Sequence, residues 1–232
     1  MSTERLGTTD GSHDAYVVWL HGLGDSPAGW AMPCAIISDR LAKLGHAKLL
    51  WELPEAPVQP VTCNGGHSCT SWMDLATIPV TPGMEDTGKD LAASIDIVTE
   101  LIEAQVAKGI PRRRVIVGGF SQGGALSLTA ALKQKEPVAA ACVLSGWAPP
   151  SANLAAEAER VAAAPAPTQF LLCHGAADGV VVPPCGQEAA AILEKAGLPS
   201  ALKIYPGMAH SSCGAEIDDI VAFIDKVLKA AD

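Results

Sequence analysis

The feature that most constrains the fold is a repeated alternation between short apolar runs and segments with helical periodicity. The apolar runs predict buried strands at residues 16–20, 47–53, 114–119, 138–144, 168–175 and 201–205. The helical patterns predict helices at residues 35–44, 88–108, 122–134, 186–196 and 215–229. Strands and helices that alternate in this way favour an α/β fold, with a mostly parallel central sheet and helices on both faces.

The length of 232 residues allows one large domain, which we expect to cover residues 16–232 behind a flexible N-terminal tail at residues 1–15. Two irregular regions, residues 54–87 and 147–167, interrupt the alternation. Long ordered loops in such a fold often form lids or walls of a site, but plain surface excursions are the open alternative.

Charge argues against a nucleic-acid partner. The formal net charge is −9, and the sixteen basic residues are scattered, whereas binding to phosphates needs clustered Lys and Arg. The one basic cluster, residues 112–114, lies just before a predicted strand and is interpreted as a solvated turn.

The sequence gives no sign of targeting to or through a membrane. It shows no signal peptide, no lipidation motif and no apolar run near the roughly 18 residues of a spanning helix. The seven cysteines lack metal-ligand spacing and are interpreted as reduced thiols. We therefore expect a cytoplasmic protein with at most peripheral membrane contact, and with no metal or cofactor.

The strongest chemical signal is the segment Gly119-x-Ser121-x-Gly123, which lies between a predicted strand and a predicted helix. This is the context of a nucleophile elbow, a turn so tight that the serine takes strained backbone angles. Glycines two residues to either side leave room for the chain to double back. The Ser121 hydroxyl is thus predicted to project from the carboxyl edge of the sheet.

A serine nucleophile needs a base and an orienting carboxylate. Among the six histidines, only His210 follows the last strand, where a Ser…Asp…His order places the base. Asp178, just past the strand at 168–175, is the predicted acid, and a turn-forming Asp-Gly pair is the alternative. The rival carboxylates downstream fall in predicted helices and are Glu188, Glu194, Glu216 and Asp218.

A glycine-rich turn follows the first predicted strand, in the segment LHGLGDS at residues 20–26. Such a turn at a strand end can aim backbone N–H groups at a developing oxyanion. The second donor would be the N–H group of Gln122, the residue after the nucleophile. An ordinary tight turn is the alternative for the glycine-rich segment.

Together these motifs resemble the acyl-protein thioesterases, also called the phospholipase/carboxylesterase group of α/β-hydrolases. The resemblance runs from about residue 16 to residue 228 and rests on the segments HGLGD, APVQPVT, SWMD, GGFSQGGALSL, HGAADGVV and GMAHSSC. It implies an α/β-hydrolase fold, with Ser121 as nucleophile, Asp178 as acid and His210 as base. It also implies an oxyanion hole formed by the N–H groups of Leu23 and Gln122.

Members of this family hydrolyse S-acyl thioesters on lipidated proteins, and often lysophospholipids or small esters. The resemblance therefore implies a serine hydrolase that removes acyl groups such as palmitoyl from proteins, through a Ser-His-Asp acyl-enzyme mechanism. A broad carboxylesterase or lysophospholipase is the first alternative. A small-molecule receptor on a hydrolase scaffold is the second, because fold does not fix function. The protein substrates, the preferred chain length and the oligomeric state stay open.

Two segments depart from the animal pattern of the family. Residues 64–72 are more polar and richer in glycine than the expected apolar flap, and Gly146 stands where a bulkier residue is common. Both segments would border the acyl channel, for which Trp72, Leu75 and Trp147 are the candidate lining residues. Ordinary packing of large side chains is the alternative.

Overall fold

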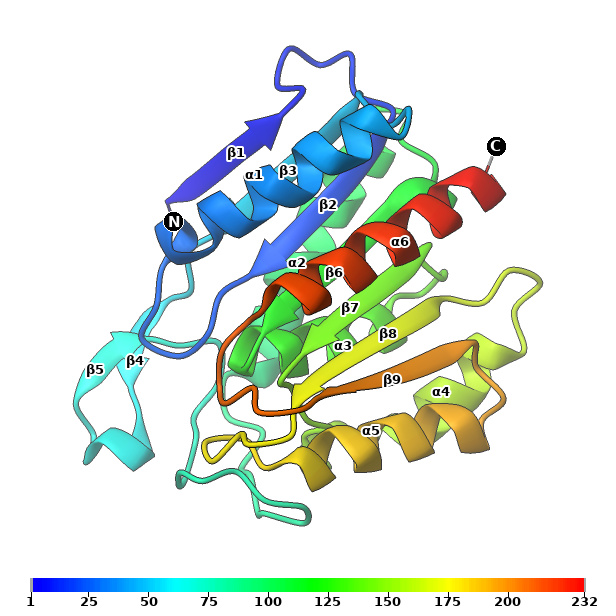
Figure 1. The fold of residues 1–232 in the computed structure, drawn as a ribbon. Coiled ribbons are helices and arrows are strands. Elements are labelled where there is room, and N and C mark those ends of the chain that lie inside the picture. The colour runs from blue at the N-terminus through cyan, green and yellow to red at the C-terminus, as the bar shows by residue number, and fades with distance from the viewer. Residues whose placement is uncertain (1, 232) are drawn as a thin grey trace.

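The computed structural model describes residues 2–231 and contains a central seven-stranded sheet in the order β1-β3-β2-β6-β7-β8-β9 (Figure 1). All neighbouring strands are parallel except β1 and β3, which are antiparallel. The predicted mostly parallel sheet is therefore confirmed. The strands are β1 (Thr3–Gly7), β2 (Ala15–Leu20), β3 (Leu49–Pro54), β6 (Val115–Phe120), β7 (Ala140–Leu144), β8 (Gln169–Gly175) and β9 (Ser200–Tyr205).

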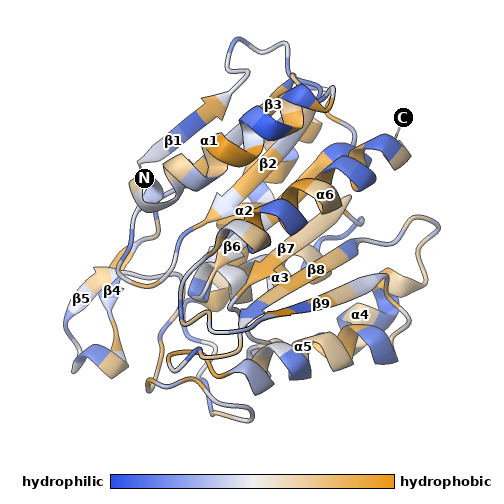
Figure 2. Cartoon of the chain, viewed as in Figure 1, coloured by the Kyte–Doolittle hydropathy of each residue, from blue (hydrophilic) through white to orange (hydrophobic). Residues whose placement is uncertain are grey.

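In the described part of the chain six α-helices flank the sheet, and each face has its own hydrophobic core. Helices α1 and α6 cover one face, and α2, α3, α4 and α5 cover the other (Figure 1). Figure 2 shows that the central strands are apolar while the helices carry mixed faces, as expected for a sheet buried on both sides. The helices are α1 (Pro27–Lys43), α2 (Leu91–Val106), α3 (Gln122–Lys133), α4 (Leu154–Ala162), α5 (Pro183–Lys195) and α6 (Gly214–Ala231).

The expectation of a flexible tail over residues 1–15 is wrong for residues 3–7, which form the edge strand β1. The Arg5 guanidinium donates to a Glu52 carboxylate oxygen at 2.7 Å, and the Tyr16 hydroxyl donates to the other oxygen at 2.8 Å. These bonds give hydrogen-bond partners to both oxygens of a carboxylate that is buried in β3, and Arg5 balances its charge. The strand escaped prediction because only alternate residues of it are half-buried, so no apolar run marks it.

The irregular regions contain more regular structure than the sequence indicated. Helix α4 lies within residues 147–167, where flanking prolines conceal its short apolar stripe of Leu154, Ala158 and Val161. Helix α1 begins eight residues before its predicted start, because Pro27 occupies the first turn and Pro33 interrupts the pattern without ending the helix.

Residues 54–87 carry a small antiparallel hairpin, with strands β4 (Val58–Pro60) and β5 (Ser68–Thr70). The hairpin projects beyond the central sheet (Figure 1). Its connection contains a short 3-10 turn at Thr62–Asn64, and its last strand leads directly into Ser71 and Trp72. This hairpin is hydrogen-bonded to the loop after β2, through Gly24 N–H and the Thr70 carbonyl.

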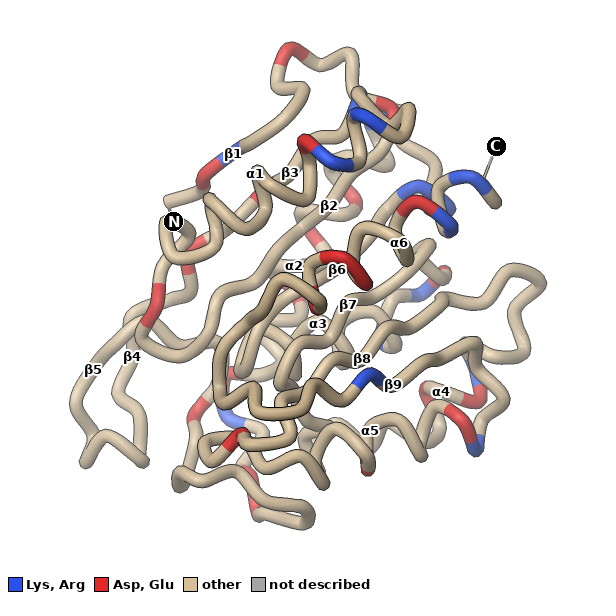
Figure 3. The backbone as a smooth tube through the Cα atoms, viewed as in Figure 1, with Lys and Arg blue, Asp and Glu red and all other residues tan. Residues whose placement is uncertain are grey.

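Basic side chains are distributed among acidic ones rather than gathered on one face (Figure 3). Residues 112–114, predicted as a solvated turn, form a 3-10 turn in which Arg112 pairs with Glu103 and Arg114 pairs with Asp14. Within residues 2–231, no helix combines the length and the apolar character needed to cross a membrane.

One acidic side chain lies inside the core beneath α6. Glu216 is fully buried in the first turn of this helix, and burial raises its pKa from 4.5 to about 7, against a smaller opposing effect of Ser212. The folded protein thus holds a proton on Glu216 that the unfolded chain releases near pH 4.5. The stability from this proton is complete below about pH 4.5 and is lost as the pH rises through about 7.

We expect Glu216→Gln to remove this pH dependence, because an amide stays neutral across the whole range. The effect corresponds to about 3 kcal/mol of unfolding free energy between the two limits. Urea denaturation at pH 4.5, 6 and 8 measures it, with the exposed Asp218→Asn on the same helix as the control. If wild type and Glu216→Gln show the same change in unfolding free energy between pH 4.5 and 8, the assignment is wrong.

Candidate active site

Ser121 lies at the turn between β6 and α3, with φ 57° and ψ −120°. A positive φ is costly for a residue with a side chain, so the surrounding contacts must hold it. The Ser121 N–H donates to the Leu144 carbonyl at 2.8 Å, and the Ser121 carbonyl accepts from Ala125 at 3.0 Å. The backbone strain that the sequence predicted at this turn is present.

The glycines beside Ser121 are required by space. A Cβ atom on Gly119 would lie 2.6 Å from the Gly123 carbonyl oxygen, and one on Gly123 would lie 2.6 Å from that of His21. Neither position tolerates a side chain, because both approaches are to backbone atoms that cannot rotate away. The structure thus supports the sequence argument that these glycines let the chain double back.

His210 lies in the loop between β9 and α6, and its Nε2 atom is 2.9 Å from the Ser121 hydroxyl oxygen. Its Nδ1 atom is 2.8 Å from a carboxylate oxygen of Asp178. The Phe120 ring packs against the imidazole with centroids 4.6 Å apart. The structure therefore brings the three predicted side chains into one hydrogen-bonded chain.

Asp178 is buried in the turn after β8, where it contacts His210 and also bonds to the turn; its role as the acid stays a prediction. Its second carboxylate oxygen accepts from the N–H groups of Val180 and Val181, each at 2.9 Å, so it also forms the turn. His174 lies underneath, with Nε2 at 2.8 Å from the Val181 carbonyl and 3.5 Å from Asp178. Burial lowers the pKa of His174, which keeps this second imidazole neutral beside the acid.

The rival carboxylates lie elsewhere. Asp218 pairs with Arg40, Glu216 is buried beneath α6, and Glu188 and Glu194 lie on α5. In the part of the chain that the structure describes, Asp178 is the carboxylate that contacts His210.

Leu23 and Gln122 line a pocket of about 200 Å³ together with Ser121 and His210, and their backbone N–H groups are the predicted oxyanion donors. Neither group donates a hydrogen bond within residues 2–231. Free donors at the start of a helix and in a glycine-rich turn suit an oxygen that develops negative charge. The oxyanion hole that the family resemblance implied stays a prediction.

The Gln122 side chain has a task that the sequence reasoning missed. Its amide nitrogen donates to the Met73 carbonyl at 2.7 Å and to the Ser71 hydroxyl at 3.0 Å, and its oxygen accepts from the Trp72 N–H at 2.8 Å. Gln122, the residue after the predicted nucleophile, therefore ties residues 71–73 to the start of α3. A buried glutamine beside a nucleophile was the available signal, since such a side chain requires partners.

Two of the three candidate channel residues line the pocket. Leu75 and Trp147 border it together with Val80. Trp72 is not among the lining residues: it is fully buried, and its indole N–H donates to the His21 carbonyl at 2.9 Å. For Trp72 the structure supports the packing alternative, because the hydrogen bond fixes the ring within the core.

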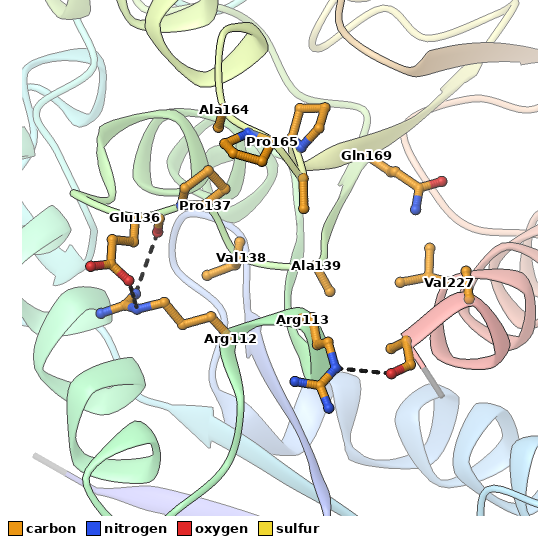
Figure 4. Close-up of a pocket in the computed structure, with 14 residues that line it drawn as sticks. Arg112, Arg113, Glu136, Pro137, Val138, Ala139, Ala164, Pro165, Gln169 and Val227 are labelled. Atoms are coloured by element: carbon orange, nitrogen blue, oxygen red, sulfur yellow. Dashed lines mark hydrogen bonds and ion pairs between the residues drawn. The ribbon is translucent and has the colours of Figure 1, made fainter.

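A roomier pocket of about 510 Å³ lies at the opposite, amino-terminal edge of the strands (Figure 4). Arg112 there reaches toward Glu136, and Arg113 donates to the Ala231 carbonyl. None of the residues that carry the predicted chemistry borders this pocket. Within residues 2–231, no three His, Cys, Asp or Glu side chains gather to hold a metal ion, and the expectation of cofactor-free chemistry stays a prediction.

A serine at a strained strand-to-helix turn, joined to a histidine and an aspartate from later loops of a mostly parallel sheet, defines an α/β-hydrolase of the serine hydrolase class. Comparison with known sequences gives the family. Residues 3–228 match the sequence profile of phospholipase/carboxylesterase, and the chain belongs to that family.

Similar proteins span most of the chain. Acyl-protein thioesterase 1 of Mycosarcoma maydis is 38% identical, covering 93% of this chain and 92% of its own. A probable carboxylesterase of Oryza sativa subsp. japonica is 35% identical, covering 94% and 79%. Among solved structures, Zea mays acyl-protein thioesterase 2 is 28% identical with a TM-score of 0.80, covering 98% and 99%. The predicted α/β-hydrolase fold and hydrolase class are confirmed.

We expect Asp178→Asn to keep the fold and lower kcat by about 10⁴. An amide can present its NH₂ group to the imidazole and favour the wrong tautomer of His210. Steady-state kinetics on a simple ester measures the loss, with Asp218→Asn as the control. If Asp178→Asn keeps most of its activity, the carboxylate only forms the turn.

Proposed function

We propose that the protein hydrolyses acyl thioesters and esters, with S-acylated proteins as its physiological substrates. The observation that carries the proposal is the continuous hydrogen-bonded chain from Ser121 through His210 to Asp178, in a pocket also lined by Leu23 and Gln122. The relatives named acyl-protein thioesterase 1, from Mycosarcoma maydis and Cryptococcus neoformans, support acyl groups on proteins as the substrate.

The proposed reaction has two halves. His210 Nε2 takes the Ser121 proton as the serine oxygen attacks the acyl carbon, and the N–H groups of Leu23 and Gln122 stabilise the oxyanion. His210 then gives the proton to the leaving thiolate or alkoxide, which departs and leaves an acyl-enzyme. Water repeats the cycle: His210 removes its proton, and the returning proton restores the Ser121 hydroxyl as the carboxylic acid leaves.

Asp178 accepts the Nδ1–H of His210 throughout and stabilises the imidazolium ion. Its own geometry is fixed by the two N–H groups of the turn, so it presents one oxygen to the ring without rotating. The residues proposed for the chemistry thus come from four different loops.

A broad carboxylesterase or lysophospholipase is the second candidate. It is supported by relatives from rice and Arabidopsis thaliana that carry the name carboxylesterase. A pocket of about 200 Å³ with apolar walls accepts an acyl group regardless of what the carbonyl is attached to. A cytoplasmic location and a single domain over residues 16–232 stay predictions.

Ser121→Ala is expected to lower kcat by on the order of 10⁶ while leaving the fold intact. A fluorophosphonate probe should label the wild-type protein at Ser121 and fail to label this variant. The neighbouring exposed Ser211→Ala serves as the control and should behave as wild type. Probe attached to another serine, or binding of an ester without turnover by the wild type, overturns the proposal.

Trp147→Ala is expected to shift selectivity toward longer acyl chains, because it removes a wall of the pocket. Each methylene that gains an apolar contact is worth roughly 0.8 kcal/mol, or about fourfold in kcat/KM. The measurement is kcat/KM across a chain-length series of acyl thioesters and matching esters. Trp72→Ala, which alters the core instead, should lower all members of the series alike, and an equal loss in Trp147→Ala assigns that residue a packing role.

A further inference from the structure

The loop that carries the Leu23 N–H group is held by hydrogen bonds to another segment of the chain. Residues 21–25 form four hydrogen bonds with residues 56–72, the excursion that contains the β4–β5 hairpin. These are Ala56 N–H to His21 Nε2 at 3.0 Å, Gly24 N–H to the Thr70 carbonyl at 2.8 Å, the Thr70 hydroxyl to the Asp25 carbonyl at 2.6 Å, and the Trp72 indole N–H to the His21 carbonyl at 2.9 Å.

The first peptide group of interest joins Gly22 to Leu23. Its carbonyl accepts from His21 Nδ1 at 2.8 Å and from the Asp25 N–H at 3.2 Å. A trans peptide is planar, and its carbonyl and N–H point in opposite directions. Because His21 fixes the direction of the Gly22 carbonyl, it also fixes the direction of the Leu23 N–H group.

The protonation state of His21 follows from its partners. Ala56 donates to Nε2, so this nitrogen must carry a lone pair, and the ring proton sits on Nδ1 facing Gly22. Burial lowers the pKa of His21, which keeps the ring in this neutral form. The Trp72 ring packs against it with centroids 5.3 Å apart, which restricts its rotation.

The second peptide group joins Leu23 to Gly24, and Thr70 holds it. Its N–H donates to the Thr70 carbonyl, and the Thr70 hydroxyl donates to the carbonyl of Asp25, the next residue of the loop. Leu23 is therefore flanked by two peptide groups whose orientations are set by other residues. Its own N–H group is left without a partner in the described part of the chain, and Leu23 lines the same pocket as Ser121.

We propose that His21 and Thr70 are positioning residues that aim the Leu23 N–H group at the oxyanion. Neither residue borders the pocket, so neither touches the acyl group directly. Through Thr70, the position of the exposed β4–β5 hairpin determines the orientation of the loop that carries the Leu23 N–H group. The inference rests on the proposed function, because it assigns Leu23 its role.

The hydroxyl of Thr70 allows a matched set of variants. Thr70→Val has nearly the same shape and keeps the carbonyl but loses the bond to Asp25, whereas Thr70→Ser keeps the hydroxyl. The control is Thr62→Val, which removes a hydroxyl of the same excursion that bonds to Asp74 at 2.8 Å instead. Loss of a whole oxyanion donor costs about 10²–10³ in kcat, so we expect a roughly tenfold loss when one is misaimed.

The expected result is a lower kcat with little change in KM for Thr70→Val, recovery in Thr70→Ser, and wild-type kinetics in Thr62→Val. Affinity for a trifluoromethyl ketone, whose adduct with serine places an oxyanion in the hole, should fall in parallel with kcat. A merely structural role would lower the melting temperature of Thr70→Val. It would not lower kcat at constant KM, and it would not lower the affinity for the ketone.

His21→Asn tests the proposed role of His21. The asparagine amide still offers a donor, but it has no ring nitrogen to accept from the Ala56 N–H group. We expect a loss of kcat at least as large as in Thr70→Val. The Thr70 series decides the matter if this buried variant does not fold. Equal kinetics in Thr70→Val and Thr62→Val, with Ser121→Ala inactive, overturns this inference alone, whereas an active Ser121→Ala overturns the proposed function.

Discussion

The close backbone contact between α3 and the end of β2 underlies the whole site. A Cβ atom on Gly123 would lie 2.6 Å from the His21 carbonyl oxygen and closer still to that of Leu20. Only a glycine lets the first turn of α3 approach the β2 strand end this closely. This approach brings the N–H group of Gln122 and the loop of Leu23 to the same pocket, although about a hundred residues separate them in sequence.

The other parts of the site are placed by the sheet and then fixed by hydrogen bonds. The parallel sheet delivers the loops after β2, β6, β8 and β9 to one edge, so each contributes a polar group without a long detour of the chain. Buried hydrogen bonds then fix each loop: Gln122 to residues 71–73, the turn N–H groups to Asp178, and His21 to the Gly22 carbonyl. A reaction that develops charge at one oxygen benefits from this fixed geometry, because the donors need no reorganisation.

The sequence predicted the parts of the molecule whose signal is local. The buried strands appear as apolar runs, and Gly119-x-Ser121-x-Gly123 marks a turn with one geometric solution. Strand β1 left no such signal because it is half-exposed, and α4 is short and lies between prolines. Gly and Pro within an element, as at Pro33 of α1, made its start appear later than it is.

Some residues of the candidate site could likewise be predicted from the sequence and others could not. Ser121, Asp178 and His210 follow from chain order and from their positions after strands, and the structure brings them together. Trp72 could not be separated from Trp147 by sequence, since both are large aromatic residues in irregular segments near the site. The partner of the Trp72 indole, the carbonyl of His21, lies fifty-one residues away and becomes visible only in three dimensions.

Strand β1 has a consequence for the behaviour of the protein in concentrated solution. It covers β3, every residue of which is buried, and thereby keeps a long apolar strand from standing at the edge of the sheet. The outer strand β1 is itself short and polar, with Glu4 and Arg5 in its middle. At the other edge, β9 is mostly exposed and carries Lys203. Charged edge strands disfavour pairing with the sheet of a second molecule, so both edges of this sheet disfavour aggregation.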